Sequence, residues 1–137
     1  MDLGLTNLPV YTGLCASLLM LLHVVLMFLV IAKRGKYEIN IGDGGNAEMQ
    51  QAIRVQGNFV ENAPIFLIGL ALIELMVGAN TWVLVMGAVF VIGRLLHAVG
   101  ISMTTGLSMP RFIGTVASIL VTVVAACYLG YTVLDRM

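Results

Sequence analysis

The sequence predicts an all-α integral membrane protein, a bundle of four transmembrane helices. Hydrophobic residues make up 60% of the 137 residues and charged residues only 10%, whereas a soluble domain carries about 25% charged residues. No charged side chain occurs between Asp2 and Lys33, and none between Arg111 and Asp135. Each gap exceeds the ~20 apolar residues that cross a bilayer as a helix. This composition excludes a soluble domain, a disordered chain and a nucleic-acid-binding protein with a basic face.

The first expected span covers residues 8–32 and ends at the basic run of Lys33, Arg34 and Lys36. No basic segment precedes it, and it is longer than the apolar core of a signal peptide, so we expect a retained span. Residues 37–46 form a polar loop. Its sequence Gly42-Asp43-Gly44-Gly45 lacks the spacing of a phosphate-binding loop and predicts a turn.

The remaining spans are expected at residues 47–77, 81–103 and 110–134. Asn46 can cap the first of these, and Glu48 lies in its first turn, where the helix dipole favours an anion. Such a helix is roughly 46 Å long, more than the ~30 Å hydrocarbon core, so its polar N-terminal third should project from the membrane or tilt.

Four spans place both termini on one side of the membrane and the loops after the first and third spans on the other. Those two loops carry Lys33, Arg34, Lys36 and Arg111, whereas the opposite side has only Arg136. The positive-inside rule therefore predicts that the two loops are cytoplasmic. In a bacterial inner membrane the termini would be periplasmic.

A polar stripe runs along the cytoplasmic half of the second helix. At 100° per residue, Asn58 lies ~40° from Arg54 and Glu61 ~20° away on the other side, with Gln50 on the same stripe. Arg binds a carboxylate through two parallel hydrogen bonds and Glu accepts from an ammonium group, so this face suits a zwitterionic ligand. The alternative is that Arg54 and Glu61 only pair with each other inside the bundle.

Three further side chains at the same membrane level can take part in chemistry. Arg94 and His97 are an i,i+3 pair on the third span, where they can complete the site or pair with Glu61. Arg111 follows Pro110 at the start of the fourth helix. A guanidinium beside a helix N-terminus can stabilise a thiolate; alternatively, Arg111 only anchors the loop at the membrane surface.

Other features point to structure rather than chemistry. His23 is alone in the first span and is expected to be a satisfied helix-contact residue. Glu74 lies ~160° from the Arg54 stripe and is excluded from the site. No metal site is expected.

Small residues recur every four positions on the fourth helix, which lets helices approach closely in lipid. They are Gly114, Ser118, Thr122, Ala126 and Gly130, with Gly93 and Gly100 on the third helix.

Residues 54–64 (RVQGNFVENAP) and 93–100 (GRLLHAVG) resemble the membrane-associated proteins in eicosanoid and glutathione metabolism, the MAPEG family. Within that family the chain is most similar to small bacterial members. The resemblance implies a homotrimer of four-helix subunits, with glutathione bound at each subunit interface in the cytoplasmic half of the membrane.

The resemblance also implies roles for individual residues. Arg54, Asn58 and Glu61 look like glutathione contacts on the second helix, and Arg94 and His97 like contacts on the third. Further candidate contacts are Gln56, which resembles a family glutamine that faces the neighbouring subunit, and Asn62. Asn62 and Ile101 stand where the leukotriene-synthase branch has tyrosines. Arg111 is the candidate for the thiolate-stabilising arginine, with Arg94 nearby.

These observations lead us to expect a glutathione S-transferase of the microsomal type, with peroxidase activity as an option. Glutathione would be the co-substrate, no metal would be needed, and a hydrophobic electrophile would enter from the lipid. One alternative is a non-catalytic lipid- or ligand-binding scaffold of the same fold. Another is a small multidrug exporter, but such exporters rely on a membrane-embedded carboxylate in the first span, where this chain has only His23.

Overall fold

The computed structural model describes residues 7–104, 106 and 108–137, and in this part of the chain all regular structure is helical. The helices are α1 (Val10–Tyr37), α2 (Ala47–Val77), α3 (Thr81–Met103) and α4 (Met109–Leu134). Each of the four is long and apolar enough to cross a membrane. The prediction of an all-α membrane four-helix bundle is therefore confirmed.

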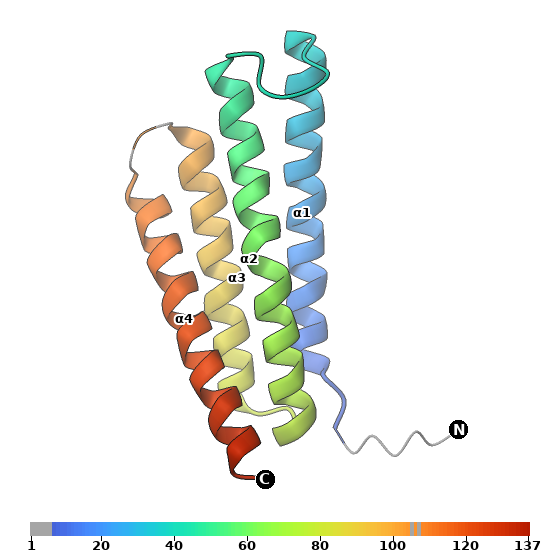
Figure 1. Ribbon diagram of the computed structural model, residues 1–137, viewed down its shortest axis with the longest axis vertical. Coiled ribbons are helices and arrows are strands. Elements are labelled where there is room, and N and C mark those ends of the chain that lie inside the picture. Colours follow the sequence, from blue (N-terminus) through green and yellow to red (C-terminus); the bar gives the residue numbers. More distant parts are fainter. Residues whose placement is uncertain (1–6, 105, 107) are drawn as a thin grey trace, which may run out of the picture.

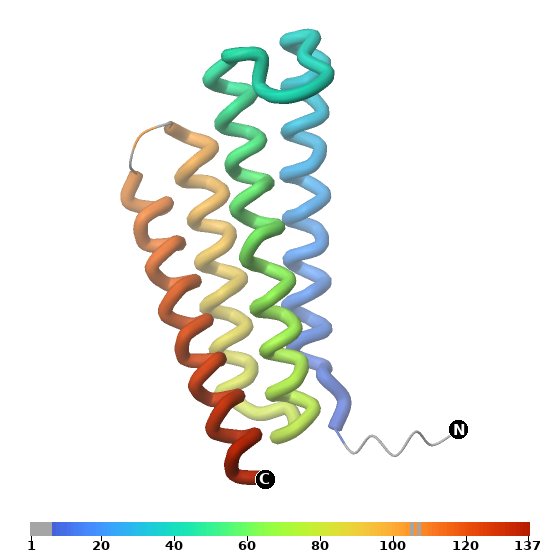
Figure 2. The backbone as a smooth tube through the Cα atoms, in the orientation of Figure 1, coloured from blue at the N-terminus to red at the C-terminus, as the bar shows by residue number. Residues whose placement is uncertain are grey.

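The helices alternate in direction, so that the α1–α2 and α3–α4 connections lie at one end of the bundle, and the start of α1 and the end of α4 lie at the other (Figure 1). α2 and α3 each pack against all the other helices, whereas no contact joins α1 to α4 within the described residues. The α1–α2 hairpin reaches beyond the α3–α4 loop (Figure 2). At this polar end the N-terminal part of the long α2 therefore projects past α3 and α4, together with the end of α1.

Side-chain caps determine where three of the helices begin. Asn46 accepts a hydrogen bond from the backbone N–H of Met49 at 3.0 Å, which confirms the predicted cap. Asn80 accepts from Trp82 and Val83 at the start of α3, and Ser108 accepts from Arg111 at the start of α4. Such caps satisfy amide groups that a helix leaves without an internal partner.

α1 continues to Tyr37, past its expected end near Ala32. The charged run marks the end of the apolar segment but not of the helix, because basic side chains stabilise the negative end of the helix dipole. Arg34 then organises the loop by donating to the carbonyl oxygens of Ile39, Asn40 and Gly42 at 3.1 to 3.3 Å. Gly42 and its two following glycines have positive φ values, which confirms the predicted turn.

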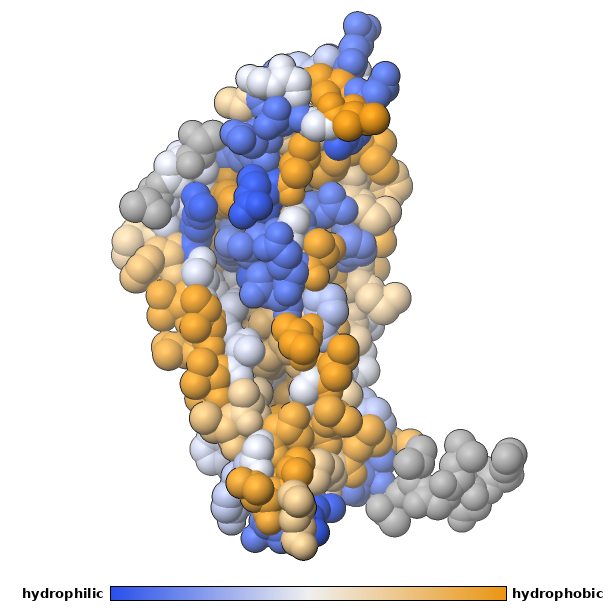
Figure 3. Space-filling model, viewed as in Figure 1, coloured by the Kyte–Doolittle hydropathy of each residue, from blue (hydrophilic) through white to orange (hydrophobic). Residues whose placement is uncertain are grey.

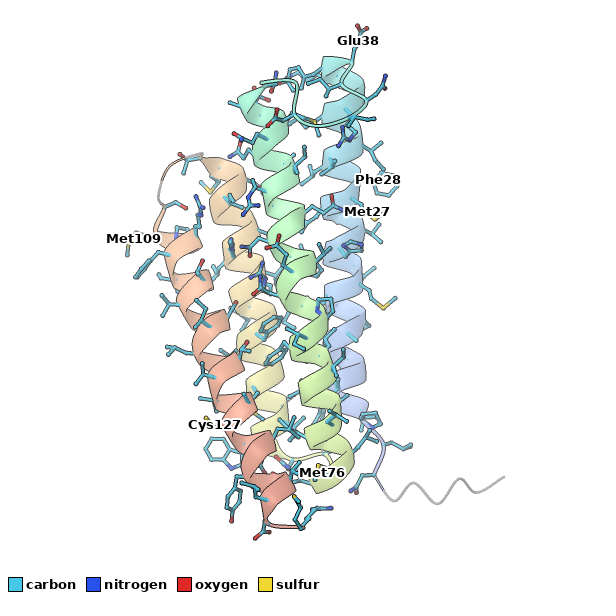
Figure 4. All side chains as sticks on the ribbon, viewed as in Figure 1. Met27, Phe28, Glu38, Met76, Met109 and Cys127 are labelled. Carbon is cyan, nitrogen blue, oxygen red and sulfur yellow. The ribbon has the colours of Figure 1, made fainter. Side chains whose placement is uncertain are left out.

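The outer surface of the bundle is mainly apolar. Met27 and Phe28 on α1 and Met109 and Cys127 on α4 project outward (Figure 4). The core between the helices is built from fully buried side chains such as Leu70, Ile73, Val83 and Phe90. A helix that is apolar on both its inner and its outer faces suits a bilayer environment.

α3 and α4 approach closely where small residues face each other. A Cβ added at Gly100 would collide with the backbone of Arg111, and one at Gly114 would collide with the backbones of Gly93 and His97. The close approach is therefore confirmed at Gly93, Gly100 and Gly114. It does not extend along the whole row of small residues, because Ala126 and Gly130 are exposed and a Cβ at Gly130 meets no described atom within 4 Å.

Glu74 and His23 complete the description of the buried polar groups on α1 and α2. Glu74 is fully buried and accepts hydrogen bonds from the N–H of Tyr11 and from the N–H and hydroxyl of Thr12, at 2.7 to 2.9 Å. His23 stacks on Phe59 with 5.7 Å between ring centroids, but its Nδ1 has no hydrogen-bond partner within the described residues. The expectation that His23 is satisfied is wrong, because apolar side chains surround it on α1 and α2.

Candidate functional site

The N-terminal half of α2 carries a polar surface. Gln50, Arg54, Glu61 and Asn62 are exposed on it and Asn58 is half-buried. Hydrophilic side chains gather over the upper half of α2 in the space-filling view, and apolar side chains cover the lower half (Figure 3). Polar side chains exposed on a membrane helix are costly in contact with lipid, so this surface needs a polar neighbour.

Arg94 lies behind this surface on α3 and is only 4% exposed. Its Nη2 donates to Oδ1 of Asn58 at 2.7 Å, and its Nε has no partner in the part of the chain that the structure describes. The ion pairs found among the described residues join Lys33 and Lys36 to Glu48, so neither Arg94 nor Arg54 pairs with Glu61. The structure therefore presents a buried guanidinium whose charge is not compensated by a neighbouring carboxylate.

His97 lies one turn after Arg94 on α3 and is also 4% exposed. Neither of its ring nitrogens has a hydrogen-bond partner among the described residues. Its backbone packs against Gly114 on α4, which explains why its side chain is enclosed. A buried imidazole without partners has the capacity to bind a polar ligand or water.

Arg54 and Arg111 come together in a pocket between α2, α3 and α4. The pocket has a volume of about 250 Å³ and is also lined by Gln50, Gln51 and Ile101. Arg111 donates to the carbonyl of Gly106 at 3.4 Å, and Gln51 donates to the carbonyl of Ile101. Two guanidinium groups from helices far apart in sequence thus meet at the loop end of the bundle.

The remaining candidate residues lie outside this pocket. Glu61 and Asn62 are exposed on α2, and Asn62 donates to the carbonyl of Asn58 at 2.7 Å. Gln56 is half-buried. The sequence analysis did not identify Gln51, which lines the pocket beside Gln50. The sequence signal for Gln51 is its position next to Gln50 in the same polar turn.

Fold and site together define a small polytopic membrane protein with a cationic polar region inside its helical bundle. The chain belongs to the MAPEG family, whose model matches residues 12–131. The family resemblance carried by the Arg54 and Arg94 segments is thereby confirmed.

Two bacterial relatives extend this comparison. The chain is similar to the inner membrane protein YecN of Escherichia coli K12 and to YecN of Escherichia coli O6:H1. In each case 41% of residues are identical over 90 residues, which is 65% of this chain and 68% of the relative.

Proposed function

We propose that this protein is a glutathione-dependent membrane transferase that conjugates the glutathione thiolate to hydrophobic electrophiles. Membership of the MAPEG family supports this class of reaction. Glutathione is a peptide with two carboxylates, an ammonium group and a thiol. The polar half of α2, with the adjoining parts of α3 and α4, offers groups that complement each of these.

The observation that carries the proposal is the uncompensated positive charge. Arg94 is buried, and among the described residues its side chain has Asn58 as its one hydrogen-bond partner. Arg54 and Arg111 line one pocket. A buried charge is costly unless it is paired, and guanidinium groups bind carboxylates through strong paired hydrogen bonds. An anionic peptide bound here would supply the missing charge, while Glu61 would accept from its ammonium group.

In the proposed reaction Arg111 stabilises the thiolate, because a cation beside a helix N-terminus lowers a thiol pKa. The thiol releases its proton to water, and the thiolate sulfur forms a bond to the electrophilic carbon as the leaving group departs with its electron pair. The electrophile enters from the lipid. With a hydroperoxide as the acceptor, two glutathione molecules would be oxidised to the disulfide while the O–O bond is reduced to an alcohol and water.

We further propose that the protein works as a homotrimer in the bacterial inner membrane. Arg54, Glu61 and Asn62 are exposed on a membrane helix, and contact with neighbouring copies would remove them from lipid. Gln56 would face the neighbouring subunit. The relatives named as inner membrane proteins support the location, and the basic loops support cytoplasmic placement of the α1–α2 and α3–α4 connections.

The test is calorimetric titration of the purified protein with glutathione and S-hexylglutathione, followed by an assay of conjugation to 1-chloro-2,4-dinitrobenzene. We expect Arg54→Ala to weaken binding at least tenfold, since one charged hydrogen-bonded pair is worth about 1.5 to 3 kcal/mol. Arg136→Ala, at the opposite end of the bundle, is the matched control. No binding by the wild type would overturn the proposal, and binding without turnover would favour a non-catalytic scaffold.

An exporter is disfavoured by the position of the buried carboxylate. Both oxygens of Glu74 are occupied by donors at the start of α1, whereas a proton-coupled exporter needs a carboxylate that can exchange its proton and bind cargo. Proton-driven efflux of a drug from proteoliposomes that contain the protein would contradict this argument and would favour an exporter.

A further inference from the structure

A second pocket lies between α1 and α2, apart from the arginine-lined one. It has a volume of about 230 Å³ and is lined by apolar side chains, among them Leu19 and Leu67, with His23 as its polar side chain. The apolar cavity of about 150 Å³ that binds benzene in an engineered protein is smaller. The pocket between α1 and α2 therefore has room for one aromatic ring with a short substituent.

One polar atom of the pocket wall has no hydrogen-bond partner in the described part of the chain, and a second lacks its usual helical donor. Nδ1 of His23 is buried and forms no hydrogen bond with the described residues. Pro64 lies inside α2 and has no N–H, so the carbonyl of Val60, four residues earlier, loses its helical donor. Val60 and Pro64 both line the pocket. In the bilayer interior an unsatisfied polar group is costly because no water is present to bind it, so an occupant that supplies a hydrogen bond is favoured.

The depth of the pocket restricts the chemistry of that occupant. His23 lies three residues past the centre of the apolar segment 8–32, which ends before Lys33, and is therefore about 5 Å along the axis from that centre at 1.5 Å per residue. This places the pocket near the bilayer midplane, where a charged headgroup is costly. His23 and Phe59 both line the pocket, and their rings stack at 5.7 Å and 18°, so the wall of the pocket has an aromatic part that favours contact with another ring.

We propose that this pocket binds a neutral, lipid-soluble phenol or hydroquinone. The ring lies in the apolar space beside Phe59, and the hydroxyl group hydrogen-bonds to the His23 imidazole or to the free carbonyl of Val60. A hydroxyl group both donates and accepts, so it can satisfy either group. The site is independent of the glutathione pocket, and its occupant needs no role in conjugation.

The experiment compares 4-pentylphenol with pentylbenzene, which has the same shape without the hydroxyl group. Binding of each labelled probe is measured with wild-type protein in nanodiscs, and the partitioning into empty nanodiscs is subtracted. We expect saturable binding with about fivefold preference for the phenol, because a neutral hydrogen bond contributes about 1 kcal/mol. Absence of saturable binding, or equal affinity for the two probes, overturns the proposal.

Two variants remove the hydrogen bonds while keeping the fold. His23→Phe preserves the stacked ring, and Pro64→Ala restores an N–H that reclaims the Val60 carbonyl. At least one of them must reduce the preference for phenol over pentylbenzene, and failure of both overturns the proposal. Leu67→Ala is the control, because loss of an apolar wall weakens both probes and leaves their ratio unchanged. Glutathione titration of the same samples reports separately on the proposed function.

Discussion

The guanidinium of Arg94 on α3 donates to the side-chain oxygen of Asn58 on α2 at 2.7 Å. This contact joins the two central helices at a level where Arg94 is almost fully enclosed. Because the described residues give Arg94 no carboxylate partner, Asn58 holds the guanidinium in its observed orientation. The contact therefore bears both on the stability of the bundle and on the geometry of the proposed site.

Replacement of Asn58 by Ala should destabilise the bundle by about 2 kcal/mol. Hydrogen bonds between membrane helices average only about 0.6 kcal/mol, but this variant leaves a buried charge without its acceptor, which costs about 1.5 to 3 kcal/mol. The measurement is reversible unfolding in detergent. Asn62→Ala is the matched control, because Asn62 is exposed and its side chain bonds only to its own helix. Equal stability of the two variants would contradict the role given to Asn58.

Glu74 should hold the start of α1 against α2. It accepts the N–H groups of Tyr11 and Thr12, which are donors that the first turn of a helix cannot satisfy internally. Glu74→Ala should destabilise the protein by about 2 kcal/mol and speed hydrogen exchange at Tyr11 and Thr12. Glu74→Gln keeps an acceptor oxygen and should lose less. Unchanged exchange at both amides in the Ala variant would show that Glu74 does not cap α1.

The glycine contacts between α3 and α4 give a prediction with a control inside the chain. Gly100→Ala would place a Cβ against the backbone of Arg111, whereas a Cβ at Gly130 meets no atom within 4 Å. Overpacking of this kind costs about 1 to 3 kcal/mol. Gly100→Ala should therefore lower the thermal unfolding temperature, and Gly130→Ala should leave it unchanged or raise it. A lowered value for both variants would contradict the assignment of the Gly100 effect to the Arg111 contact, because alanine has a higher helix propensity than glycine and a Cβ at Gly130 meets no described atom.

The helices could be predicted from the sequence because the thickness of the bilayer sets the length of a membrane-spanning segment, and the cost of burying charge keeps charged residues out of it. The absence of charge between Asp2 and Lys33 and between Arg111 and Asp135 located α1 and α4, and the side chain of Asn46 located the start of α2. The end of α1 at Tyr37 was missed, because apolarity marks the limit of the membrane segment and not that of the hydrogen-bonded helix.

The contacts between helices could not be predicted in the same way. Helical periodicity places Arg54, Asn58 and Glu61 on one face, but it does not say which helix covers that face. The meeting of Arg54 with Arg111 in one pocket depends on how α4 packs across α2 and α3. The Glu74 cap on Thr12 likewise depends on the relative height of α1 and α2, which no local pattern in either helix encodes.

The different positions of Arg111 and Arg54 predict different effects on catalysis. Arg111 lies at the N-terminus of α4, where its charge and the helix dipole both favour a thiolate. Removal of that charge should raise the pKa of bound glutathione by about one unit. The thiolate then forms only at higher pH, so the rising limb of the conjugation rate against pH should move upward in Arg111→Ala. Arg111→Lys keeps the charge and should restore most of the wild-type profile.

Arg54→Ala should weaken glutathione binding while the pH at half-maximal rate, measured with saturating glutathione, stays at the wild-type value. Arg54 lies within the first turns of α2 and lines the same pocket, so we expect it to anchor a carboxylate and not the sulfur. The paired measurements are the glutathione Kd and the pH profile of the thiolate absorbance in the bound state. If Arg54→Ala shifts the profile and Arg111→Ala does not, the two roles are exchanged, because the cation nearer to the sulfur has the larger effect on its ionisation.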